Sequence, residues 1–324
     1  VYGVSPGGNW EGHTILNRLA SLALRSAEEE AVLADCRALL LQVRKHRVEP
    51  GFDDKVLVDW NGLTIAALAE SALVFARSDW LDAASRAFRS ILQNHWRDGT
   101  LYHSWRNGEV RHLATAEGYA NLIGAGLALY AVSADEAFLG EAISLTDAAV
   151  ADLWDAVGGG FYFASRHASD LLVRARFAHD DATPNANATM LANLSRLWLL
   201  TGEERYRELA DATIRAFAAA VAGNPFAHAS FLSAFDQYID ALQAVLVGDP
   251  ASPEITTLRA AVLELPGPLP VLLYARSSAA LKPGHPAHGK SAQGSAALYL
   301  CRGSRCALPV TRAGDARAAF ASLG

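Results

Sequence analysis

The chain has 324 residues and a formal net charge of −6, with 28 lysine and arginine residues against 34 aspartate and glutamate residues. This length can bury one large or two modest hydrophobic cores. The acidic balance argues against nucleic acid as a partner, because binding to phosphates requires clustered cations. No apolar run is long enough to span a bilayer and no signal peptide opens the chain, so we expect no membrane association and a cytoplasmic location.

The start of the sequence suggests that the chain is a piece of a longer protein. The first residue is Val1 and the single methionine is Met190, so we do not expect a complete translation product. Residues 1–12 are rich in glycine and predict a loop. A polar helix is expected over residues 28–46.

One pattern then recurs: a short polar cluster precedes a helix rich in alanine and leucine, and a second helix runs back. Such hairpins bring the same end of every second helix together, so polar residues distant in sequence share one pocket. Asn107-Gly108 predicts a small β-hairpin between helices, and residues 161–163 and 171–177 predict another. The expected helices cover residues 61–75, 78–95, 116–132, 134–154, 185–200, 203–222 and 228–242.

The C-terminal part has a different pattern, in which strands alternate with short helices and predict a small α/β module. Residues 280–294 are rich in proline, glycine, histidine and serine and predict a mobile loop. The expected elements are strands at 244–247, 271–274 and 297–300, and helices at 253–265 and 315–323.

Together these elements predict a mainly α fold. It is a partial (α/α) toroid of helical hairpins with small inserted β-hairpins over residues 1–240, followed by the small α/β module over residues 241–324. Small residues on the expected inner helices, such as Ala66-Ala67 and Gly124-Ala125-Gly126, allow close packing around a narrow ring. Six helix pairs would close such a ring, and we count about three and a half, so the toroid is expected to be open.

Four segments share their pattern with one known family. They are Gly8 to Gly12 (GNWEG), Asp53 to Leu63 (DDKVLVDWNGL), Asp180 to Asn187 (DDATPNAN) and Cys301 to Val310 (CRGSRCALPV). These segments resemble the GN-[FW]-EG, DDK-x-L-x-x-WN-x-L, DGAxPSGN and C-x4-C-x-x-PV motifs of the thioredoxin-domain-containing, spermatogenesis-associated protein 20 family. The resemblance extends over nearly the whole chain.

The resemblance implies an N-terminal thioredoxin-like domain followed by a six-hairpin glycosidase-like toroid. This chain would begin after that domain and after the first hairpins, and the thioredoxin-like domain would be its partner in the full-length protein. The chain departs from the family where a pocket would be lined. Glu117-Gly118 stands in place of paired acids, and Pro184 to Asn187 lacks the serine and glycine of PSGN.

Hydrolysis of a glycoside requires two carboxyl groups on either side of the scissile bond. Acids before a helix also cap its free N–H groups, and Lys55 beside two acids also suits a structural ion pair. Aromatic rings can stack on a sugar or pack in the core. The candidate catalytic residues are Asp53, Asp54, Glu117 and Asp180. The candidate substrate-binding residues are Trp10, Lys55, Trp60, Asn61, Tyr119, Asp181 and Asn187.

Histidines and cysteines leave further alternatives open. His112, His179 and His228 precede expected inner helices and suit either proton transfer in an epimerase-like reaction or a structural role. Cys301 and Cys306 suit two packed thiols, a reversible redox-active disulfide or, with two histidines of the 280–294 loop, a zinc site. We expect that the chain binds no metal and no cofactor.

The sequence therefore predicts a domain that binds or processes carbohydrate, with a pocket at the N-terminal ends of the inner helices. If it is an enzyme, a glycosidase-like or epimerase-like reaction is expected, on a small-molecule sugar ligand. The alternatives are a non-catalytic scaffold that serves other domains and a thiol-redox partner of the thioredoxin-like domain.

Overall fold

The computed structural model describes residues 1–169, 171–277 and 281–324. The chain divides into two compact units, Val1–Asp54 and Lys55–Gly324. The first unit contains α1 (Ala27–Arg44), whose N-cap Ser26 forms a capping box with Glu29. No residue of α1 is buried. The polar helix expected over residues 28–46 is confirmed.

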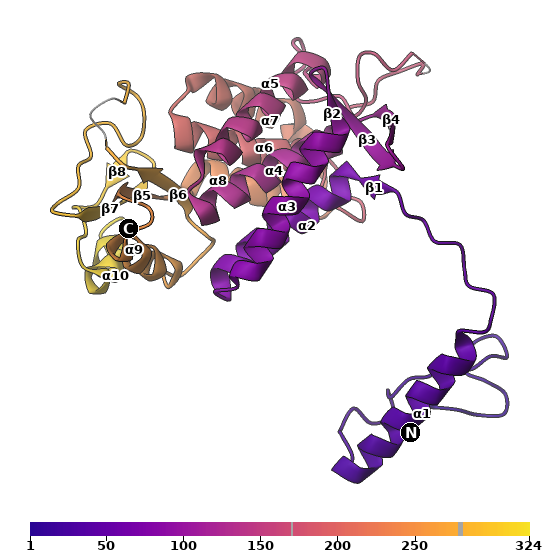
Figure 1. Cartoon of the computed structure of the whole chain (residues 1–324). Helices are drawn as coiled ribbons and strands as arrows, with labels where there is room; N and C mark the ends of the chain where they lie inside the picture. The colour runs from indigo at the N-terminus through magenta and orange to yellow at the C-terminus, as the bar shows by residue number, and fades with distance from the viewer. Residues whose placement is uncertain (170, 278–280) are drawn as a thin grey trace. The chain divides into compact units, whose positions relative to one another are not determined.

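The second unit is mainly helical and alternates inner and outer helices. The inner helices pack side by side in chain order, and each outer helix packs against the inner helix before it. This arrangement is an open (α/α) toroid and confirms the expected fold (Figure 1). The inner helices are α2 (Val58–Val74), α4 (Ala116–Ser133), α6 (Ala186–Thr201) and α8 (Ala229–Asp240), and the outer helices are α3 (Ser78–His95), α5 (Glu136–Leu153) and α7 (Glu204–Gly223).

Small residues set the spacing of the inner helices. A Cβ atom on Gly62 would lie 2.7 Å from the backbone of Asn121, and one on Gly118 would lie 2.8 Å from Val58. Helix α4 is apolar on nearly every face, because it is enclosed by α2, α5 and α6. The outer helices complete the core, where the rings of Phe88 and Phe138 meet edge to face at 5.6 Å.

A small antiparallel sheet precedes α4. Its turn Asn107-Gly108 has positive φ at both residues, 51° and 85°, as a two-residue hairpin of this kind requires. The expected hairpin is thus confirmed. The strands are β1 (Val56–Leu57), β2 (Trp96–Arg97), β3 (Thr100–Arg106) and β4 (Glu109–Leu113), and β3 pairs with each of the other three.

The second expected hairpin is wrong over the residues that the structure describes, a range that excludes residue 170. Phe161 forms only an isolated bridge to Trp154, and one backbone bond joins Phe163 to Ala175. Side chains occupy the backbone groups that a strand pair would use, because the amide of Asn187 bonds both the N–H and the carbonyl of Phe161.

The C-terminal module packs on the C-terminal ends of the inner helices. The hydroxyl of Tyr274 donates to the carbonyl of Ala131 at 2.8 Å, and Arg259 donates to that of Val132 at 3.0 Å. The sheet order is β6-β5-β7-β8, with β5 parallel to β6. The module contains β5 (Leu242–Gly248), α9 (Pro253–Leu263), β6 (Val271–Ala275), β7 (Ala296–Arg302), β8 (Arg305–Cys306) and α10 (Ala316–Ala321). Short 3-10 turns cover Pro225–His228 and Ala313–Asp315.

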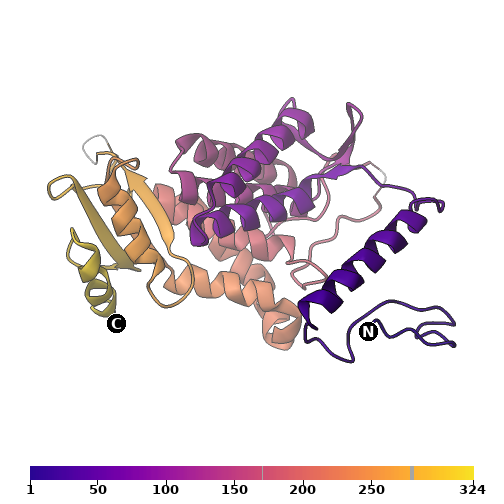
Figure 2. The same ribbon diagram turned by 60° about the horizontal axis from the view of Figure 1, so that its bottom comes forward.

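Figures 1 and 2 show this module at one end of the helix array and the β1–β4 sheet at the other. Both lie in the second compact unit, and a domain boundary at residue 240 stays a prediction. Part of the expected 280–294 loop falls on residue 280, outside the described residues, and residues 281–294 have no regular structure. Among the described residues, no helix has the length and apolar character to cross a membrane.

Candidate functional site

The N-terminal ends of the inner helices lie together, as the recurrent pattern predicts. The amide of Asn121 on α4 donates to the carbonyl of Asp59 on α2 at 3.3 Å. The amide of Asn193 on α6 donates to the carbonyl of Ala120 at 2.7 Å. The N–H of Ser230, in the first turn of α8, donates to Asp180 at 2.9 Å. These bonds hold residues of α2, α4, α6 and α8 in one layer.

Three carboxylates interact at this end. Glu117 lies half-buried in the first turn of α4. Burial raises the pKa of Glu117, and the negative charges of Asp59 and Asp181 raise it further. The N-terminus of a helix favours an ionised acid, so burial and repulsion outweigh the helix dipole at this position. A carboxyl group that holds its proton more tightly than usual, beside two other acids, suits a general acid.

Asp59 was missed as a candidate site residue. The sequence predicts a helix from Asn61, but α2 begins at Val58, which places Asp59 in its first turn with 8% exposure. The N-cap of α2 is Leu57, whose side chain makes no capping bond, so no local capping signal marks the true start. The position of Asp59 inside the DDKVLVDWN motif was the available clue.

Asp180 is fully engaged by the protein. Its carboxylate accepts bonds from the N–H and hydroxyl of Ser230 and from the N–H of Asn185. Burial raises the pKa of Asp180, but the bonds from Ser230 and Asn185 and the charge of His228 outweigh burial and lower it. The side chain thus caps α8, and its catalytic role stays a prediction.

Two predicted ligand-binding side chains instead make hydrogen bonds inside the protein. Tyr119 is 2% exposed, and its hydroxyl accepts the N–H of Leu101 at 3.2 Å. Asn187 is also 2% exposed, and its amide nitrogen donates to the carbonyls of Phe161 and Phe177. Both side chains therefore hold the surrounding backbone, and neither has a free polar atom directed at a ligand.

Four other candidates are more accessible. Asp181 is exposed on the loop before α6, and Trp60 is 63% exposed on α2. Asn61 donates to the carbonyl of Leu57 at 2.8 Å. Lys55 lines a separate cavity of about 330 Å³ with residues of β3 and β4, including Arg106 and Arg111. Lys55 thus lies beside other cations of the small sheet.

The remaining candidates, Asp53, Asp54 and Trp10, belong to the first unit, Val1–Asp54. Asp53 and Asp54 are exposed, and Trp10 is 62% exposed and forms a bridge with His13. Their membership of a shared pocket stays a prediction.

A cavity of about 260 Å³ follows the inner helices from this end. Residues four apart on a helix share a face, so Leu63 and Asn121 in its wall follow Asp59 and Glu117 by one turn. Asp59 and Glu117 therefore stand at its rim. Its polar lining residues are Asn121, Thr189, Asn193, Arg196, Ser230, Ser233 and Gln237.

The predicted histidines have separate environments. His228 is buried, and its Nδ1 lies 2.8 Å from the carbonyl of Asn224. His179 is exposed and its ring lies 4.9 Å from that of Phe177, while His112 is exposed on β4. Over the described residues, no cluster of three or more histidine, cysteine or acidic residues could hold a metal ion.

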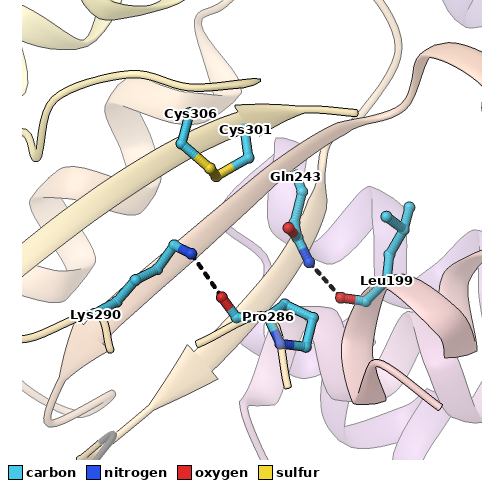
Figure 3. Close-up of a disulfide and its surroundings, with 6 residues drawn as sticks. All are labelled: Leu199, Gln243, Pro286, Lys290, Cys301 and Cys306. Atoms are coloured by element: carbon cyan, nitrogen blue, oxygen red, sulfur yellow. Dashed lines mark hydrogen bonds between the residues drawn. A yellow bond between two sulfur atoms is a disulfide. The ribbon is translucent and has the colours of Figure 1, made fainter. Parts of the chain in front are cut away.

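Cys301 and Cys306 form a disulfide between β7 and β8, so the expectation of two packed thiols is wrong (Figure 3). Cys301 is buried and Cys306 is exposed. Both line a cavity of about 310 Å³ that Lys290 also lines. Burial lowers the pKa of Lys290, whose ammonium donates to the carbonyl of Pro286 at 2.7 Å.

The class of protein that this geometry defines is an open (α/α) toroid with acids at the inner-helix N-termini. Similar folds include an α-mannanase of glycoside hydrolase family 76 from Bacteroides thetaiotaomicron, with a TM-score of 0.47 and 18% identity over 59% of this chain and 54% of that chain. Another is the cellobiose 2-epimerase of Spirochaeta thermophila, with a TM-score of 0.44 and 20% identity over 52% of this chain and 44% of that chain.

Particular relatives are found by sequence, although no family model matches. The chain is 27% identical over 337 residues to human spermatogenesis-associated protein 20, covering 94% of this chain and 42% of that protein. The rat protein of the same name is 27% identical over 344 residues, covering 96% and 44%. The chain thus spans about two fifths of the length of these curated relatives.

Proposed function

We propose that the second unit is a carbohydrate-processing domain whose pocket lies at the N-terminal ends of the inner helices. Glu117 is its general acid, and Asp59 or Asp181 supplies the second carboxylate. The observation that carries the proposal is the raised pKa of Glu117, caused by burial and by those two acids. A raised pKa on a carboxyl group beside other acids is what the general acid of a glycosidase requires.

Accessible side chains complete the pocket. The exposed ring of Trp60 offers an apolar face on which a sugar can stack. Asn121 and Thr189 line the cavity below the acids and offer hydroxyl and amide groups to a sugar. Asp53, Asp54 and Trp10 stay predicted members of the pocket, and Asp180 contributes by fixing the start of α8.

The test is a screen of the whole chain against monosaccharides and disaccharides. We expect one class of saccharide to raise the melting temperature, because a ligand that binds only the folded state stabilises it. For a disaccharide that binds and is cleaved, E117Q should retain binding but lower the rate of reducing-end release about a hundredfold or more. The control is E208Q, which removes an exposed carboxylate from the outer helix α7.

Two outcomes would contradict the proposal. One is that no saccharide changes the melting temperature, in which case the scaffold alternative is favoured. The other is that E117Q and E208Q change the rate equally, which would remove the specific role of Glu117.

A second candidate function rests on the disulfide. Because Cys306 is exposed and Cys301 buried, a thiolate of a dithiol protein can attack Cys306 Sγ, and Cys301 leaves as a thiolate. The partner's second thiolate then attacks its own sulfur in the mixed disulfide and releases both cysteines reduced. We propose the thioredoxin-like domain of the full-length protein as that dithiol. Disulfides in the cytoplasm are usually redox-active, so a cytoplasmic location accords with this candidate.

The redox candidate is tested by trapping the mixed disulfide. A dithiol protein that lacks its second cysteine should become linked to Cys306 and not to Cys36, the exposed free cysteine. Linkage to Cys36 alone, or to neither residue, would contradict it.

A further inference from the structure

Arg196 projects from α6 into the interior of the helix array. It lines the 260 Å³ cavity and also a smaller enclosed cavity at the C-terminal ends of the inner helices. With a rise of 1.5 Å per residue, Arg196 lies about 16 Å along α6 from its N-cap Asn185. It is therefore well removed along the helix from the acids at the rim.

The guanidinium of Arg196 has no partner within the described part of the chain. No hydrogen bond or ion pair joins it to any residue there, although its side chain is only partly exposed. Burial lowers the pKa of Arg196, and the charge of Glu70 offsets this in part, yet no carboxylate oxygen of residues 1–169, 171–277 and 281–324 lies within 4.0 Å of it. Arginine remains charged under such conditions, and a desolvated charge without a partner is costly to keep.

The facing helix supplies further donors. Ser233 and Gln237 are four residues apart on α8, share one face and line the same cavity as Arg196. Neither side chain makes a hydrogen bond within residues 55–169, 171–277 and 281–324. No acidic side chain of the described residues lines this cavity. A cation and two uncommitted polar side chains thus face the same cavity.

We propose that this cavity binds the anionic group of a small ligand, a carboxylate or a phosphate, on Arg196, Ser233 and Gln237. The planar guanidinium can hold two oxygens of such a group at once. The serine hydroxyl and glutamine amide donate to the remaining oxygens. That the anion is carried by a sugar rests on the proposed function, whereas the anion site itself does not.

The test is a binding titration of the whole chain at fixed ionic strength. The probes are inorganic phosphate, D-glucose 6-phosphate, D-glucuronate and neutral D-glucose. We expect at least one anion to bind, with an affinity that falls as salt rises. R196Q should weaken that binding about tenfold to a hundredfold, because a charge-assisted hydrogen bond is lost. Phosphate or glucose 6-phosphate binding identifies a phosphate, and glucuronate binding identifies a carboxylate.

Further variants guard against misfolding of R196Q. S233A, at an exposed residue, and Q237L are two such single variants. Each should weaken anion binding while leaving the melting temperature of the free protein unchanged within a few degrees. E70Q should strengthen anion binding, because it removes the carboxylate that competes for Arg196.

The proposal is overturned if no anion binds, or if R196Q, S233A and Q237L all bind the anion as the wild type does. It is also overturned if E70Q lowers stability and leaves anion affinity unchanged, since Arg196 would then serve Glu70. Binding of glucose without binding of any anion would overturn this proposal and leave the carbohydrate pocket standing.

Discussion

The two ends of the inner helices differ in how they are completed. At the C-terminal end, the α/β module covers the helices. Leu272 of β6 lines a cavity of about 50 Å³ there with Leu73 and Leu200 of the helices, and a wider cavity of about 810 Å³ opens beside Tyr130, Thr201 and Tyr274. At the N-terminal end, polar residues line a cavity of about 260 Å³, and Asp59 and Glu117 stand at its rim. One end is thus covered by a second layer of strands and helices, and the other gathers acids and amides at the helix N-termini.

The difference shows which polar residues are structural. Acids at helix N-termini and cations nearer the C-termini both accord with the helix dipole, so charge placement alone identifies no site. The pKa directions separate the acids. Asp180 has a lowered pKa because protein donors hold it, whereas Glu117 has a raised pKa because burial and like charges act on it. Of these two acids, Glu117 is the one whose surroundings favour the protonated form.

The largest expected effect concerns Asn187 at the N-terminal end. N187A would leave the N–H and carbonyl of Phe161 and the carbonyl of Phe177 unpaired inside the protein. We expect a loss of about 3 kcal/mol in the free energy of unfolding, measured by urea denaturation. The control is N94A on α3, where the amide bonds only the preceding turn. Equal effects of the two variants would mean that Asn187 is not a structural bridge.

The disulfide tests the C-terminal module. The double variant C301S/C306S should lower the free energy of unfolding by about 2 kcal/mol, because the closed loop is short and the entropy it removes is small. Reductant should lower the free energy of unfolding of the wild type to that of the double variant. The control C36S should behave as the wild type does, with and without reductant. An oxidised wild type no more stable than the double variant would show that the bond does not support the module.

Asp180 should show an effect that depends on pH. Its pKa is lowered in the folded state, so its stabilisation is present above the ordinary aspartate pKa and lost as pH falls through the folded value. D180N should therefore cost about 1 kcal/mol at pH 7, as for loss of a helix cap, and little in acid. D82N on α3, an exposed site, is the control. A cost that does not change with pH would refute the capping role.

The smallest expected effect has the opposite sign. The raised pKa of Glu117 means that its ionised form destabilises the fold, and this loss grows as pH rises through the folded pKa. E117Q should thus be slightly more stable than the wild type at pH 7 and equal to it below the ordinary glutamate pKa. Thermal unfolding at pH 4 and pH 7 measures this, with E208Q as the control. A less stable E117Q at pH 7 would make Glu117 a structural residue.

Local signals account for what the sequence could predict. The helix expected over residues 185–200 forms as α6, and the side chain of its N-cap Asn185 accepts the N–H of Asn187 at 2.8 Å. Asn107-Gly108 likewise encodes its own turn. By contrast, the N-cap of α2 is a leucine with no capping side chain, so Asp59 was overlooked. The expected strands near Phe161 do not form, because the amide of Asn187, distant in sequence, bonds the backbone of Phe161.

Tertiary packing also determines that Tyr119 is buried and that Arg196 makes no hydrogen bond to the described residues. Leu101, whose N–H donates to the hydroxyl of Tyr119, is distant from Tyr119 in sequence. Helix α8, which faces Arg196, is likewise distant from Arg196 in sequence. The sequence therefore predicted where the helix ends meet, and the structure was needed to tell engaged groups from available ones.

The most direct test of the central claim is the titration of the Glu117 carboxyl carbon by NMR, in the wild type and in D59N and D181N. The account predicts a pKa above the ordinary glutamate value in the wild type and a lower pKa in each variant, since each removes a neighbouring negative charge. An ordinary or lowered pKa that neither variant changes would show that the three acids do not interact, and the proposed pocket would be lost.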